Sequence, residues 1–145
     1  MNINKIKKIL ELHREWLESD GISGVRADLS GADLRHFDLS GAELSESDLS
    51  GADLSEADLR EAQFSFADLR NADLSFVNLS GANLRAADLR GAILRGAKLI
   101  GADLHNAELS DADFSFADLR DADLSGAYLS DADFSCSALS GADVR

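Results

Sequence analysis

The sequence predicts a solenoid that turns once every five residues and carries one short helix at its start. Two observations lead to this prediction. A five-residue unit of the form A-D-L-x-x continues without insertion or deletion from Arg26 to Arg145. The residues before it lack this unit and instead place apolar side chains at helical intervals. We therefore divide the chain into a capping helix with its linker, residues 1–24, and a repeat region, residues 25–145.

The N-terminal segment has the apolar periodicity of an amphipathic helix. Its three- and four-residue intervals connect Ile3, Ile6, Leu10, His13 and Leu17. Either Asn2 or Asn4 can cap the start of this helix, and either Gly21 or Gly24 can end it. Because a solenoid leaves an open apolar core at its first coil, we expect the helix to cover that end. A helix that binds a partner is the alternative.

The repeat is strict at its central position. Stepping by five residues from Leu29 gives 24 centres, of which 20 are Leu and the others are Phe64, Phe114, Phe134 and Val144. Ala stands two positions before the centre in 20 units, and Asp stands one position before it in 15. The position after the centre is Ser in 14 units and Arg in 8. A register this regular indicates one structural unit repeated along the whole region.

Neither an α-helix nor a straight strand can use a period of five. On a helix, five steps of about 100° turn successive leucines by roughly 140°, and on a strand every fifth side chain changes face. A chain that bends once per unit can instead direct every leucine and alanine inward. The fifth position supplies the bend, because it holds all nine glycines beyond Gly24 and other residues that tolerate tight turns. These other residues are Asn71, Asn106, Asp111, Asp121 and Asp131.

The run GADLSEADLREAQFSFADLRNADLS, residues 51–75, resembles the pentapeptide-repeat family, and the likeness covers about five-sixths of the chain. The resemblance implies an all-β solenoid, a right-handed four-sided β-helix with four units in each coil. The 24 units then make about six coils, stacked at about 4.8 Å into a rod about 29 Å long. Centres twenty residues apart form columns in this arrangement, so Phe114 and Phe134 are expected to stack.

The chain is strongly acidic, with a formal net charge of −13 that lies in the repeat region. Because nucleic acids and anionic membranes are also negatively charged, direct binding to either is disfavoured. The one cysteine, Cys136, allows no disulfide within the chain, and the sequence shows neither a signal peptide nor a membrane span. We therefore expect a cytoplasmic, bacterial protein.

No combination of residues predicts catalysis or a cofactor. The three histidines, His13, His36 and His105, match no metal-binding or catalytic spacing, and Cys136 occupies an outward position. The aspartates recur in columns twenty residues apart, where a calcium ion can relieve their repulsion. We favour the alternative that each carboxylate bonds to a backbone amide of its own turn. The sequence thus predicts no catalytic residue, no cofactor and no metal.

A non-enzymatic scaffold for protein–protein contact is the function that these features favour. The positions that depart from the repeat are the best surface candidates. From Arg85 to Lys98 the local charge becomes positive, and apolar residues replace some of the usual Asp and Ser. The predicted interaction patch comprises Phe76, Ile93, Arg95, Lys98, Ile100 and Phe116. Random drift in tolerant positions is the alternative explanation of the same departures.

Two more partners follow from the family resemblance. Some pentapeptide-repeat proteins resemble duplex DNA and bind DNA gyrase in its place, so an inhibitor or protector of gyrase or another type II topoisomerase is the alternative function. A B-DNA segment about 29 Å long carries about 17 phosphate charges, a density of the order seen here. The repeat also stops at Arg145 in mid-pattern, which predicts either a longer natural chain or a homodimer through the C-terminal coil, with Leu139 and Val144 at the contact.

Overall fold

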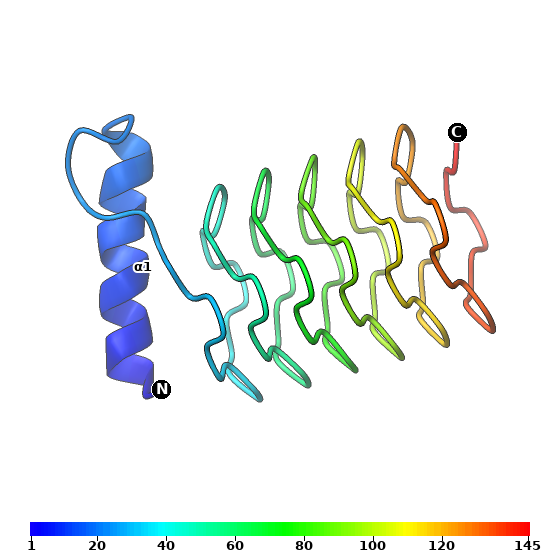
Figure 1. Ribbon diagram of the computed structural model, residues 1–145, viewed down its shortest axis with the longest axis horizontal. Helices are drawn as coiled ribbons and strands as arrows, with labels where there is room; N and C mark the ends of the chain where they lie inside the picture. The colour runs from blue at the N-terminus through cyan, green and yellow to red at the C-terminus, as the bar shows by residue number, and fades with distance from the viewer.

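The computed structural model describes residues 1–145 as one helix and a rod. The helix, α1 (Ile3–Glu18), lies across one end of the rod, and the C-terminus lies at the other end (Figure 1). The rod contains no continuous strand, because each side of a coil contributes a single residue to a parallel bridge. The helix α1 lacks the length and apolar character that a membrane-spanning helix needs.

Each coil of the rod contains twenty residues, or four units of the repeat. Every bridge joins a residue to the one twenty positions later, as Asp28 joins Asp48 and Asp48 joins Asp68. Neighbouring coils are also held together by the backbone hydrogen bonds that flank each bridge. The N–H of Leu29 donates to the carbonyl of Asp48 at 2.7 Å, and the N–H of Asp48 donates back to the carbonyl of Ala27 at 3.1 Å. The predicted four-unit coil is therefore confirmed.

The fifth position of the unit makes every corner of the coil. At the first corner, the N–H of Ala32 donates to the carbonyl of Leu29 at 3.0 Å, and Gly31 between them has a φ of 63°. All later corners repeat this turn, and φ stays positive whether the corner residue is glycine or not. A positive φ in the third position is typical of type II turns. Glycine is thus the natural occupant of the corner but does not have to fill it.

The centres of the units form a continuous core along the rod axis. From Leu29 to Leu124, every central side chain is at most 4% exposed, and the alanines between them pack into the same cluster. Phe114 and Phe134 stack as predicted, with ring centroids 4.9 Å apart. The core becomes open in the coil that follows Leu124, where Leu139 is 40% and Val144 is 58% exposed.

The helix α1 starts and ends on side-chain and backbone caps. Asn2 caps its start, because the Asn2 side chain accepts the N–H of Lys5 at 2.9 Å. At the other end, the N–H of Gly21 donates to the carbonyl of Trp16 at 2.8 Å, and Asp20 between them has a φ of 54°. The first left-handed residue after the helix is therefore Asp20, and not the glycine that the sequence predicts there.

His13 joins α1 to the open end of the first coil. Its side chain is fully buried, and its Nδ1 atom accepts the N–H of Ala27 at 3.0 Å. Its Nε2 atom lies 2.8 Å from the carbonyl oxygen of Ser45, so the ring is neutral and carries its proton on Nε2. Burial lowers the pKa of His13, as does the nearby charge of Arg26, and the hydrogen bond to Ser45 and the charges of Glu43 and Glu46 offset this lowering only in part. The expected capping role of the helix thus rests on two hydrogen bonds as well as on apolar packing.

The inward direction of the central residue can be tested with two neighbouring substitutions. Leu74→Lys places a charge in the core and is expected to lower the free energy of unfolding by about 4 kcal/mol or more. Ser75→Lys places the same side chain at the outward position that arginine fills in eight units, and we expect little change. Urea unfolding followed by circular dichroism measures both. Equal losses of stability would contradict the core assignment.

Protonation of His13 is expected to loosen the cap. A His whose folded pKa is lowered contributes stability above its unfolded pKa of about 6.5, and this contribution is lost as the pH falls below that value. The free energy of unfolding should therefore decrease between pH 7.5 and 5.5, by at most about 1.4 kcal/mol per pH unit below 6.5. His13→Gln should remove this dependence. An unchanged pH profile in the variant would show that another group is responsible.

Candidate functional site

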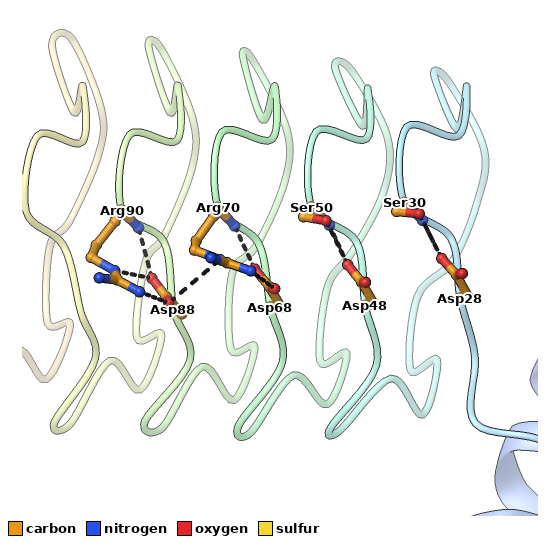
Figure 2. Close-up of polar contacts among 8 residues, drawn as sticks. All are labelled: Asp28, Ser30, Asp48, Ser50, Asp68, Arg70, Asp88 and Arg90. Atoms are coloured by element: carbon orange, nitrogen blue, oxygen red, sulfur yellow. Dashed lines mark hydrogen bonds and ion pairs between the residues drawn. The ribbon is translucent and has the colours of Figure 1, made fainter.

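The aspartates that stand just before each central residue are engaged in the turns of their own units. The carboxylate of Asp28 accepts the backbone N–H of Ser30 at 3.1 Å and its hydroxyl at 2.6 Å. Asp48 and Ser50 repeat both bonds on the next coil, as Figure 2 shows. The predicted bonding of these carboxylates to local backbone amides is thus confirmed. No group of three or more His, Cys, Asp or Glu side chains is arranged to hold a metal ion.

Where arginine follows the central residue and aspartate precedes it, the two side chains pair. Arg70 donates from Nε to Asp68 at 2.9 Å and from a terminal nitrogen at 2.6 Å, and its Nε lies 3.8 Å from Asp88 on the next coil (Figure 2). These hydrogen bonds hold the pKa of Asp68 below its ordinary value. Like charges about 4.8 Å apart in water repel by about 0.9 kcal/mol, so arginine relieves the repulsion within an aspartate column.

Arg95 departs from this pattern. The same position holds eight arginines, and seven of them have a carboxylate partner, namely Arg35, Arg60, Arg70, Arg85, Arg90, Arg120 and Arg145. Arg95 has none: Ile93 stands where its own aspartate would be, and Arg95 forms no ion pair with Asp113, the counterpart of the Asp103 that Arg85 reaches on the next coil. Its guanidinium carbon instead lies 4.6 Å from the centre of the Phe116 ring, and a terminal nitrogen donates to Ser115 Oγ at 3.3 Å. Arg95 is therefore a cation held on an aromatic ring.

Phe76 and Phe116 occupy corners of the coils on either side of Gly96. Phe76 has a φ of 56° and is 63% exposed, and Phe116 has a φ of 60° and is 55% exposed. The Phe76 ring leans over Gly96, where an added Cβ would lie only 2.5 Å from ring atom Cε1. The missing side chain at Gly96 thus provides the space in which the Phe76 ring rests.

The six residues of the predicted patch lie around one edge of the rod. Ile93, which is 41% exposed, shares a side of the coil with Arg95. Lys98 and Ile100 lie on the adjoining side, beyond the corner at Gly96, where Lys98 is exposed without an ion pair and Ile100 is half-buried. We call these six residues the Gly96 patch. Within it, Arg95 contacts Phe116 directly, and the other four residues lie near them on the same edge or its two sides.

The sequence interpretation missed two exposed aromatic side chains. Phe66 is 68% exposed at another corner, with a φ of 60°, and Tyr128 is 59% exposed at a position that usually holds aspartate. Phe66 could have been found from the sequence, because it is an aromatic residue at the same corner position of the unit as Phe76. Arg85 lies near Phe66 and is paired with Asp103 at 3.2 Å. Arg26, which also lies beside Phe66, donates to the backbone carbonyl of Glu46 and is not stacked on the ring as Arg95 is on Phe116.

The remaining candidate residues do not converge on a site. His36 lies 3.6 Å from the carboxylate of Glu56, and His105 lies 2.8 Å from Ser125 Oγ on a different side of the rod. Cys136 is exposed at a corner, as expected from its position. These residues belong to separate coils. His105 is the one base beside a hydroxyl, but Ser125 Oγ donates its proton to Asp123, so it is not activated as a nucleophile.

The structural role of aspartate can be separated from its charge at Asp68. Asp68→Asn keeps the acceptor for the backbone N–H of Arg70, as Asn78 and Asn83 do in their own units, so we expect little loss of stability. Asp68→Ala removes that acceptor and is expected to lower the free energy of unfolding by about 1 kcal/mol. Chemical unfolding of both variants decides the question. Equal losses would assign the stabilisation to the ion pair.

Comparison with solved structures places the fold among known proteins. A pentapeptide repeat protein from the thylakoid lumen of Arabidopsis thaliana is 35% identical, with 68% of this chain and 72% of that chain covered and a TM-score of 0.55. The pentapeptide repeat protein Rfr23 from the cyanobacterium Cyanothece is 28% identical, with 89% and 94% covered and a TM-score of 0.38. QnrB1, a plasmid-mediated fluoroquinolone resistance protein, is 24% identical, with 81% and 72% covered and a TM-score of 0.43. No curated protein sequence matches the chain.

The family model for pentapeptide repeats matches the whole repeat region. The model matches in eight copies, and the matched stretches overlap: residues 25–60, 38–75, 67–106, 78–115 and 107–145. The same region forms the four-sided coils described above, and α1 precedes it. The chain therefore belongs to the pentapeptide-repeat family and folds as its right-handed four-sided β-helix.

Proposed function

We propose that this protein is a non-enzymatic scaffold that binds another protein through the Gly96 patch. The observation that carries the proposal is the conformation of Phe76 and Phe116, two exposed aromatic residues held at positive φ. A left-handed conformation costs a residue with a side chain about 1–2 kcal/mol. Because neither ring is buried in the rod, the packing of these two side chains does little to offset this cost.

A protein partner can recover it. Burying an exposed aromatic side chain contributes about 1.5–3 kcal/mol, and aromatic residues and arginine are enriched at the centres of protein interfaces. The Gly96 patch combines Phe76, Phe116 and Arg95 on one edge of the rod, where a partner can reach them from both adjoining sides. This arrangement supports a binding surface better than it supports a catalytic one.

The absence of an enzyme site is also part of the proposal. The serine hydroxyls that bond to side chains donate mostly to aspartates of their own turns, as Ser125 donates to Asp123, so they are not activated as nucleophiles. Cys136 is an exposed thiol, which supports a location in a reducing compartment such as the cytoplasm. The acidic rod supports a protein partner over a nucleic acid or a membrane.

The proposal is tested by affinity capture from native cell extract. Wild type and Phe66→Ser, which changes an exposed corner outside the patch, should retain the same partner. The double variant Phe76→Ser with Ile93→Asp should lose at least nine-tenths of that partner while its melting temperature stays within a few degrees of wild type. Equal capture by all three proteins, or no partner with any of them, would overturn the proposal.

An inhibitor or protector of DNA gyrase is the alternative function. The net charge of −13 on a short rod supports it, because B-DNA carries about one charge per 1.7 Å. The ion pairs of the arginines weaken the likeness, since they neutralise carboxylates at intervals along the rod. A gyrase supercoiling assay with increasing amounts of the protein tests this alternative. A change in activity at a near-stoichiometric ratio would favour it over the scaffold.

We also propose a homodimer through the coil that contains Leu139 and Val144. Both side chains are exposed at the open end of the core, and the N–H of Leu139 has no hydrogen-bond acceptor. Pairing with a second copy would cover this apolar surface and the sheet edge together. Light scattering at micromolar concentration should give twice the monomer mass for wild type and the monomer mass for Leu139→Lys. A monomeric wild type would contradict the proposal.

A further inference from the structure

We infer that the Gly96 patch binds an apolar peptide segment that carries a single carboxylate. This inference rests on the proposed function and names the chemistry of the partner. Its starting point is Arg95, the one arginine of its position in the repeat that lacks a carboxylate.

The Arg95 guanidinium is positioned to receive an external carboxylate. It has five N–H donors, of which one is engaged with Ser115 Oγ at 3.3 Å. Its stacking on Phe116 holds the planar group in place, so less side-chain freedom is lost on binding. In the other units the same group forms two parallel hydrogen bonds with its aspartate, as Arg70 does with Asp68. The carboxylate of a partner would take the place of the one that Ile93 removes.

The surroundings of Arg95 select the rest of the segment. Ile93 is 41% and Phe76 is 63% exposed beside it, so apolar side chains of the partner can pack on both. Ile93 and Phe76 also disfavour a segment that is polar throughout. The polar groups of such a segment would lose their hydrogen bonds to water, and these two apolar side chains could not replace them.

The charges of the adjacent coils limit the partner to one carboxylate. Asp73 and Asp113 bridge to Ile93 from the coils on either side, and each lies about 4.8 Å away along the rod. A second carboxylate on the partner would approach these aspartates within the distance of about 8 Å over which charges still interact in physiological salt, so it would be repelled. A single-stranded nucleic acid can also stack on aromatic rings and arginine, but its closely spaced phosphates meet the same repulsion.

The experiment selects binders from a displayed library of random dodecapeptides. The purified full chain is the target, and Ile93→Asp is the counter-target. This substitution returns the usual residue of the repeat, so the fold should be retained while Arg95 gains an internal partner. We expect the enriched peptides to contain one Asp or Glu within three positions of Leu, Ile, Phe or Trp.

The best synthetic peptide is then measured by fluorescence anisotropy. Replacing its acid by the matching amide, or using Ile93→Asp or Arg95→Ser, should weaken binding roughly tenfold or more. Arg35→Ser is the matched control, because Arg35 lies in the same column and is paired with Asp33. It should bind like wild type, as should Phe66→Ser.

The outcomes separate this inference from the proposed function. The inference is overturned if no peptide is enriched, or if binding is insensitive to the amide and to Ile93→Asp. The proposed function survives that result if Phe76→Ser with Ile93→Asp still loses the cellular partner. Both fail if neither the library nor the extract yields binding that depends on the patch.

Discussion

A positive φ at every fifth residue is the constraint on which the rest of this molecule depends. It closes each corner of the coil, and the corner returns the next alanine and leucine to the interior. The backbone groups between corners then meet those of the neighbouring coil and form the bridges. Fourteen of the 23 corners from Gly31 to Gly141 have a side chain, so cooperative stacking of coils outweighs the local preference for glycine.

The five-residue period predicted a bend in every unit and inward centres, and the family resemblance supplied the four units of each coil. The inward centres, the corner position and the stack of Phe114 on Phe134 follow from counting in fives and twenties. The helix could be predicted as well, since its apolar stripe and Asn2 cap are short-range signals. Its end was harder to predict, because the left-handed residue is Asp20, which tolerates that conformation through its short polar side chain.

Apart from the phenylalanine stack, the side-chain contacts between coils and between α1 and the rod were beyond prediction from the sequence. In the sequence, His13 looks like one more residue of the apolar stripe. Only the packed structure shows that its ring nitrogens form hydrogen bonds with the backbone of Ala27 and Ser45. From the sequence, the arginines that follow the central residues look like interruptions of an acidic surface. In the folded coil, residues on either side of the central leucine point outward together, so Arg70 reaches Asp68 directly. The sequence holds this information, but it becomes visible only when the side-chain directions are known.

The candidate site was only partly predictable, because the directions of its side chains become known only in the folded coil. Its residues were found because they depart from the repeat, yet the departures do not show how the side chains meet. The Phe76 ring rests over Gly96 and Arg95 rests on Phe116, and both contacts run along the rod, between residues twenty positions apart or nearly so. Lys98 was grouped with them although the corner at Gly96 places it on the next side.

The repeat determines what a functional surface can be in this protein. Outward positions contribute little to the core, so substitutions there change the surface without changing the fold. Where arginine follows the centre, its usual state is an ion pair with an aspartate, and this pair leaves neither charge free for a partner. Replacing the aspartate by Ile93 frees the cation and adds an apolar neighbour in one step. A binding surface can therefore arise on this rod through the loss of an internal partner, with no new fold, loop or cavity.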